Sequence, residues 1–110
     1  MNKMVFFFYI MIFGDLMKIV IAEKNEKDYL YLKDLIENWG RKRKESVHIY
    51  WYHKLYYQIP SYLSSCDLIF LEIDMKEING YEFSCMLRKN SIDIPLVFSN
   101  EKLIFCIRKL

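Results

Sequence analysis

Residues 67–80 constrain the fold of this chain more than any other stretch of its sequence. They read Asp-Leu-Ile-Phe-Leu-Glu-Ile-Asp-Met-Lys-Glu-Ile-Asn-Gly, an apolar run that ends in acidic residues and leads into a turn. A short apolar run bounded by turn residues is typical of a strand buried on both faces of a parallel sheet. From Gly80 to Lys89, apolar residues return at helical spacing. The stretch therefore predicts a buried strand, a tight turn and a helix, with carboxylates where the strand ends.

Three further strands are expected around this one. Residues 17–22 form a short β-branched run, and residues 47–52 alternate in the way that is typical of a strand. Residues 94–98 predict the fourth strand, because Pro95 fits the start of a strand but not the middle of a central one. Strands that alternate with helices predict βαβ units around a parallel sheet.

The segments between these strands have helical patterns of different strength. Asn25 can cap the first helix, and Gly40 is a natural C-terminal stop for it. Its apolar face is formed by residues at helical spacing: Leu32, Leu35, Ile36 and Trp39. Residues 54–65 are interrupted by Pro60, so they predict a short or broken helix.

Length and composition limit the classes of function. A chain of 110 residues is expected to form one domain, and its net charge of +2 argues neither for nor against nucleic acid. The basic run 41–44 ends at Glu45 and predicts a solvated loop, so no direct nucleic-acid binding is expected. Cys66, Cys85 and Cys106 are odd in number and lack C-x-x-C spacing. They predict reduced thiols in a cytoplasmic protein rather than a disulfide framework or a zinc site.

Residues 1–16 form an apolar N-terminal extension. The ten apolar residues 4–13 are too few for a membrane-spanning helix, which needs roughly 20. No small-residue cleavage site of a secretory signal follows them. Met17 opens the first predicted strand, so one interpretation is that translation starts there. The alternatives are an interfacial membrane anchor and an extra strand.

The order of elements over residues 17–100, together with two motifs, resembles the receiver domains of response regulators in two-component signalling. Residues 67–80 are similar to the family's phosphoacceptor segment, D-L-I-F-L-D-I-x-M-P-x-x-x-G. Residues 88–98 read Arg-Lys-Asn-Ser-Ile-Asp-Ile-Pro-Leu-Val-Phe. They resemble the R-K-x-x-x-D-I-P-I-V-F segment of the branch that carries LytTR-type DNA-binding domains.

The resemblance implies an α/β, flavodoxin-like fold. A parallel sheet of about four strands is expected, with helices on both faces. The family's fifth strand and last helix are expected to be missing, which would make this receiver fold incomplete. Residues 101–110 form an apolar tail that could begin the fourth helix.

The resemblance also assigns roles to acidic positions. Glu72 stands at the phosphoacceptor position, where the family has Asp, and Glu23 and Lys24 stand at the acidic pair that holds Mg²⁺. Asp74 stands at the position whose backbone carbonyl completes the metal site. Because a lysine ammonium would occupy the cation's place, the Mg²⁺ site is expected to be lost and no cofactor is expected. Lys24 beside Glu72 could form an ion pair that mimics the metal-bound state.

Two more family positions concern the end of the sheet. The hydroxyl position after the fourth strand falls on Asn100, with Ser99 one residue earlier. The family's essential Lys lies on the fifth strand, and no residue of this chain can stand for it.

The sequence thus predicts a truncated receiver-like domain that binds a partner without being phosphorylated and is not an enzyme. Its partner would be a sensor histidine kinase, a response regulator or a second copy, bound through the exposed sheet edge. A cytoplasmic protein is expected, with membrane contact through residues 4–13 as an option. Three alternatives remain: an active phosphoacceptor using Glu72 or Asp74, a small membrane-associated protein, and a non-functional gene fragment.

Overall fold

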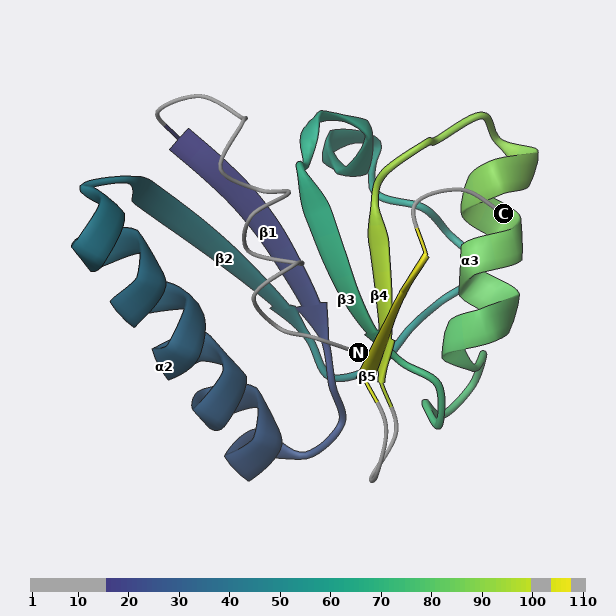
Figure 1. The fold of residues 1–110 in the computed structure, drawn as a ribbon. Helices are drawn as coiled ribbons and strands as arrows, with labels where there is room; N and C mark the ends of the chain where they lie inside the picture. The colour runs from purple at the N-terminus through teal and green to yellow at the C-terminus, as the bar shows by residue number, and fades with distance from the viewer. Residues whose placement is uncertain (1–15, 100–103, 108–110) are drawn as a thin grey trace.

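The computed structural model describes residues 16–99 and the strand Ile104–Ile107. Five strands form one sheet in the order β2-β1-β3-β4-β5. The strands are β1 (Leu16–Ala22), β2 (Ser46–Tyr52), β3 (Leu68–Glu72), β4 (Leu96–Ser99) and β5 (Ile104–Ile107). Helix α2 (Glu26–Arg43) covers one face of the sheet and helix α3 (Gly80–Lys89) covers the other (Figure 1). The predicted flavodoxin-like α/β arrangement is confirmed for this part of the chain.

The four strands β1 to β4 are parallel, and β3 lies between β1 and β4. All five residues of β3 are buried, as are the last four of β1. Apart from Glu72 at the end of β3, these buried residues are all apolar, as expected where helices cover both faces of a parallel sheet. Two core clusters result. The α3-side core includes Val20, Ile69, Leu71, Phe83, Leu87 and Leu96. The α2-side core includes Met17, Ile19, Ile21, Tyr29, Ile36 and Phe70.

The expectation that the tail begins a fourth helix was wrong. Ile104–Ile107 is a strand, and it pairs antiparallel with β4, placing Val97 opposite Cys106. An antiparallel neighbour needs only a tight connection, whereas a further parallel strand needs a long crossover. With the fifth strand expected to be missing, β4 would have been the exposed sheet edge; β5 covers it, and the two edges of the described sheet are β2 and β5.

Two helix predictions also need correction. Helix α2 does not stop at Gly40 but continues to Arg43, and Lys44 ends it in a left-handed conformation with φ 57°. A Cβ on Gly40 would lie 2.8 Å from Val47 Cγ2, so the glycine allows α2 to approach β2 closely. In residues 54–65, the expected helix is reduced to the 3-10 turn η1 (Ser61–Ser65), because Pro60 precedes it and interrupts the helical pattern.

Other predictions fall outside the described residues. These include the apolar run 4–13 and Asn100. No helix of the described residues is long and apolar enough to cross a membrane. Cys66 and Cys85 are free thiols, the first buried and the second exposed.

Candidate functional site: the carboxyl ends of β1, β3 and β4

The sheet brings the predicted acidic positions together at one edge. Strands β1 to β4 run the same way, so their carboxyl ends meet at the bottom of the sheet in Figure 1. Glu72 ends β3 and pairs in register with Ser99, the last residue of β4. Glu23 and Lys24 directly follow β1. Ligands of open α/β sheets bind beyond this edge, so the location suits a functional site.

Glu72 is a buried carboxylate with both oxygens engaged. Glu72 is only 5% exposed to solvent. Oε1 accepts a hydrogen bond from the backbone N–H of Asp74 at 3.3 Å, and Oε2 accepts one from the Ser99 hydroxyl at 3.3 Å. Burial of a charged group is costly unless such partners are present. The resemblance put the hydroxyl position at Asn100, with Ser99 one residue earlier, and it is the hydroxyl of Ser99 that contacts Glu72.

Glu23 shares the site with Glu72. Its backbone N–H donates to the carbonyl of Tyr52 at 2.9 Å, which fixes the end of β1 against the end of β2. Burial, and the nearby charge and side-chain hydrogen bond of Glu72, raise the pKa of Glu23 to about 7. The backbone N–H of Asn25 donates to Glu23 Oε2 at 3.0 Å and opposes this rise. Two carboxyls in contact are stable when one of them holds a proton, and Glu23 can hold it near neutral pH.

Lys24 pairs with Asp74, not with Glu72. Its Nζ lies 2.5 Å from Asp74 Oδ2, and this contact raises the pKa of the lysine. Lys24 was expected to pair with Glu72, and this expectation was wrong. Glu72 is more deeply buried, and the Ser99 hydroxyl, the Asp74 backbone N–H and Glu23 already contact its carboxylate. Asp74, whose backbone carbonyl the resemblance assigned to the metal site, holds the lysine with its side chain. Both partners are partly exposed, so the pair adds little to stability.

The turn after β3 holds the site against α3. The backbone N–H of Gly80 donates to the carbonyl of Ile73 at 2.9 Å, and a Cβ on Gly80 would lie 2.2 Å from the carbonyl oxygen of Glu72. Asn79 caps α3 in a reciprocal capping box with Glu82. Glu77 adopts the left-handed conformation with φ 67°. The sequence predicted this turn from Asn79 and Gly80, and the prediction is confirmed.

The described residues do not fit the family's Mg²⁺. The cation prefers oxygen ligands in near-octahedral geometry. Glu23 and Glu72 offer carboxylate oxygens, but the ammonium of Lys24 lies at the same site on Asp74. Among the described residues, no group of three or more His, Cys, Asp or Glu side chains could hold a metal ion.

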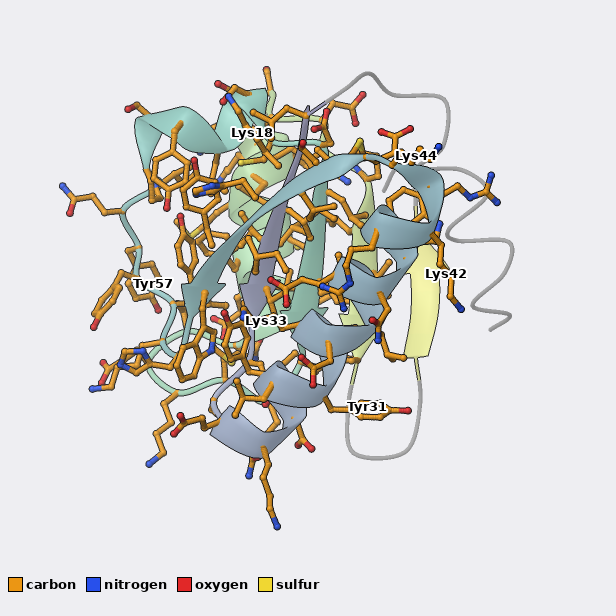
Figure 2. All side chains as sticks on the ribbon, turned by 90° about the vertical axis from the view of Figure 1, so that its left-hand side faces the viewer. Lys18, Tyr31, Lys33, Lys42, Lys44 and Tyr57 are labelled. Carbon is orange, nitrogen blue, oxygen red and sulfur yellow. The ribbon has the colours of Figure 1, made fainter. Side chains whose placement is uncertain are left out.

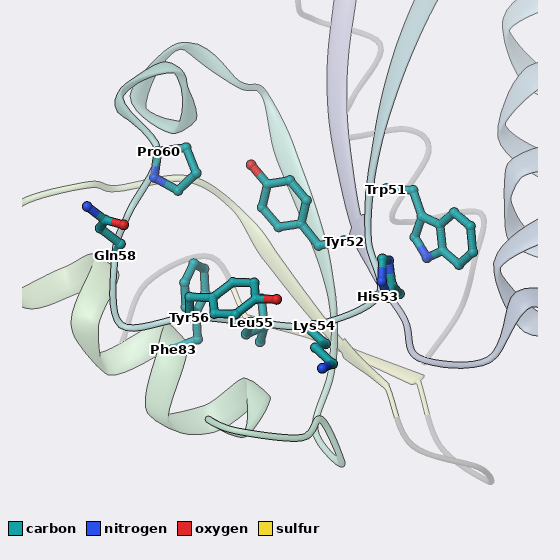
Figure 3. Close-up of a pocket in the computed structure, with 9 residues that line it drawn as sticks. All are labelled: Trp51, Tyr52, His53, Lys54, Leu55, Tyr56, Gln58, Pro60 and Phe83. Carbon is teal, nitrogen blue, oxygen red and sulfur yellow. The ribbon is translucent and has the colours of Figure 1, made fainter.

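A pocket beside the acidic site was not anticipated from the sequence. It has a volume of about 230 Å³ and lies where β2 runs into the loop before η1 (Figure 3). Its lining is largely aromatic and includes Trp51, Tyr52, Tyr56 and Phe83. The Trp51 indole N–H donates to the carbonyl of Glu23 at 2.8 Å, and its ring stacks on Tyr29 with centroids 4.2 Å apart. Trp51 therefore links the pocket to the acidic site; the run of aromatic residues at 50–52 was the available signal.

Comparisons with known proteins support the fold. No family model matches the chain, and no curated protein matches it either. A solved structure, the MaeR response regulator bound to beryllium trifluoride, has a similar fold with a TM-score of 0.53. The two sequences are 21% identical, and the match covers 79% of this chain and 69% of the other. The chain therefore has the receiver-like, flavodoxin-type fold of a response regulator; at this identity the likeness shows the fold alone.

Proposed function

We propose that this chain is a receiver-like module of two-component signalling that binds a protein partner without being phosphorylated. The contact between Lys24 Nζ and Asp74 Oδ2 at 2.5 Å carries the proposal. The family resemblance assigns Lys24 to the acidic pair that holds Mg²⁺. The ammonium of Lys24, which is a permanent part of the chain, takes the place of a Mg²⁺ ion that would bind and dissociate.

The chemistry of phosphoryl transfer supports the same conclusion. A metal ion normally neutralises the charge that develops as the phosphoryl group moves, and the nucleophile must be free to attack. Glu72 is one methylene longer than the family's Asp, it is buried, and both its oxygens accept hydrogen bonds. Burial and these hydrogen bonds hold the Glu72 carboxylate in place and make it a poor nucleophile. The module thus acts by binding and is not an enzyme.

We assign the partner to the same signalling system: a sensor histidine kinase or a response regulator in the cytoplasm. Residues 88–98 support descent from the LytTR-associated branch. The guanidinium of Arg88 donates to the carbonyls of Ile92 and Ile94, each at 2.8 Å, and so holds the loop that leads into β4. This role explains why an arginine suits the start of the motif.

An active phosphoacceptor is the second candidate. The observation in its favour is that Glu72 ends β3 with the Ser99 hydroxyl beside it. Incubation with Mg²⁺ and acetyl phosphate, followed by intact-mass spectrometry, separates the two candidates. We expect no phosphoryl mass gain for the natural chain, and a gain on Glu72 would overturn the proposal.

Variants calibrate this assay. The double variant Lys24→Asp, Glu72→Asp restores the family's residues at both positions, and we expect it to gain phosphoryl mass. Lys24→Asp with Glu72→Gln removes the acceptor and is the matched control. Because the MaeR structure contains beryllium trifluoride, fluorine NMR with that anion gives a second readout. Binding to the double variant but not to the natural chain is the expected pattern.

A further inference from the structure

We propose that two copies of this chain associate through the outer edges of their β2 strands, antiparallel about a two-fold axis at Ile49. The two five-stranded sheets would then form one continuous sheet. This inference goes beyond the proposed function and does not depend on it, because it concerns the opposite side of β2 from β1 and involves none of the acidic residues.

The backbone groups on the outer side of β2 can be assigned from one hydrogen bond. The carbonyl of Tyr52 accepts from Glu23, so it points toward β1. The N–H and C=O groups of successive strand residues point to opposite sides, so those of Val47, Ile49 and Trp51 point outward. No described residue pairs with these outward groups. They are available to another strand.

The β2 edge also lacks the features that keep natural sheet edges apart. Proteins usually protect an edge with charged side chains, proline, a bulge or a very short strand. The sequence of β2 is Ser-Val-His-Ile-Tyr-Trp-Tyr, seven residues with no Pro and no Asp, Glu, Lys or Arg. Its register with β1 is unbroken from end to end. The other described edge, β5, has only four residues. Figure 2 views the molecule from the side of α2 and β2.

The absence of charge favours a second copy as the partner. Self-pairing brings two copies of the same strand together, so a net charge on the strand would repel the same charge on its copy. In an uncharged strand this repulsion does not arise. The same residues instead give favourable pairs: Val47 would lie opposite Trp51 of the second copy, and His48 opposite Tyr50. Aromatic and β-branched cross-strand pairs of this kind stabilise a sheet.

Symmetry fixes the register. A two-fold axis perpendicular to the sheet requires the central residue to face its own counterpart. With Ile49 at the centre, all three outward-facing residues enter hydrogen-bonded pairs: Val47 with Trp51, Ile49 with Ile49, and Trp51 with Val47. Centring on His48 or Tyr50 would leave one of the three without a β2 partner. The Ile49-centred register therefore satisfies the most backbone groups.

Light scattering of the full chain at micromolar concentration tests the association. The test variant is Ile49→Pro, which removes an outward N–H that the contact with β1 does not use, and proline is tolerated on an edge strand. Ile49→Val is the matched control, because it also shortens the side chain but keeps the N–H. We expect a dimer for the natural chain and for Ile49→Val, and a monomer for Ile49→Pro. A monomeric natural chain, or an Ile49→Pro variant that stays dimeric, overturns the proposal.

Disulfide crosslinking tests the register and does not depend on the fold tolerating proline. In a background of Cys85→Ser and Cys106→Ser, an Ile49→Cys variant places its two thiols across the axis. Hydrogen-bonded antiparallel pairs have Cα atoms about 5.5 Å apart, within the range that a disulfide spans. The control is Tyr57→Cys, at an exposed loop position. We expect rapid oxidation to a covalent dimer for Ile49→Cys alone. Equal rates for the two variants would overturn the register.

Discussion

The turn after β3 and the mouth of the acidic site lie next to each other, yet their sequences relate to the receiver pattern in opposite ways. The turn keeps the family's Gly at Gly80, where the backbone of Glu72 leaves no space for a side chain. At the mouth, Lys24 stands at a position that the receiver pattern fills with an acid, and it is exposed and paired with Asp74. The turn thus matches the receiver pattern where the backbone leaves no space for a side chain, whereas the mouth of the site departs from that pattern in charge.

This difference indicates that backbone packing determines the residue in the turn, whereas the residue at the mouth of the site is free of that requirement. A residue such as Gly80 is held by packing, and replacing it would disturb the fold itself. Replacing an exposed acid by a lysine costs the fold little, because the new charge finds a partner at the surface. The charges at the mouth can therefore differ from the receiver pattern while the sheet and α3 keep their places. Substitutions in the turn and at the acidic site should therefore differ in their effect on stability.

The largest effect is expected for Gly80→Ala. A Cβ would lie 2.2 Å from a backbone oxygen, so β3 and α3 must separate, and we expect a loss of about 3 kcal/mol in the free energy of unfolding. Gly40→Ala is the control, because its Cβ would meet a Val47 side chain at 2.8 Å. Alanine's better helix propensity, about 1 kcal/mol, offsets part of that contact. Chemical denaturation should show a much smaller loss for Gly40→Ala, and equal losses would contradict the steric argument.

A smaller effect concerns Glu23 and pH. Its pKa of about 7 in the folded state lies above the ordinary value of 4.5, so the proton stabilises the fold. This stabilisation is complete below about pH 4.5 and is lost as pH rises through 7. Glu23→Gln stays neutral, so at pH 8 we expect it to be more stable than the natural chain by about 1 kcal/mol, after allowance for the solvent exposure of a half-buried group. Near pH 4.5 the two should be equal, and a pH-independent difference would exclude this role.

The smallest effect is expected for Glu77→Gly. Glu77 has φ 67°, where a side chain is disfavoured and glycine is not. We expect a gain of about 0.5 kcal/mol in thermal or chemical unfolding. Lys76→Gly is the neighbouring control, because this residue does not have positive φ. It should lose stability. A loss for both variants would mean that the Glu77 side chain contributes more than its backbone conformation costs.

The sequence was informative about the central strands and the turn, and less informative about the edge strand β5. A buried strand such as β3 is marked by an apolar run, here Leu68 to Leu71. Asn79 with Gly80 marks a turn whose requirements are local. The β5 pairing depends on which edge the tail meets, and no periodicity in four residues encodes that. Gly40 was misinterpreted as a stop because its reason for being glycine, the contact with Val47, is tertiary.

The sequence indicated which residues form the acidic site, but not which of them pair with one another. The resemblance to receivers pointed to Glu23, Glu72 and Ser99, and the parallel strands bring their ends together. Which carboxylate pairs with Lys24 depends on burial. Glu72 is buried at the end of β3, whereas Asp74 lies beyond the strand at the surface. The aromatic pocket was missed because its lining comes from β2, the loop that replaces the expected helix, and α3.

A Mg²⁺ titration tests the central claim most directly, that Lys24 stands where the family's cation would bind. Trp51 is a suitable fluorescent reporter because its indole donates to the carbonyl of Glu23, and Trp39→Phe removes the other indole. We predict no saturable change across the millimolar range for this background, and saturable binding once Lys24→Asp and Glu72→Asp are added. Saturation with a low-millimolar or tighter dissociation constant while Lys24 is present would contradict the account.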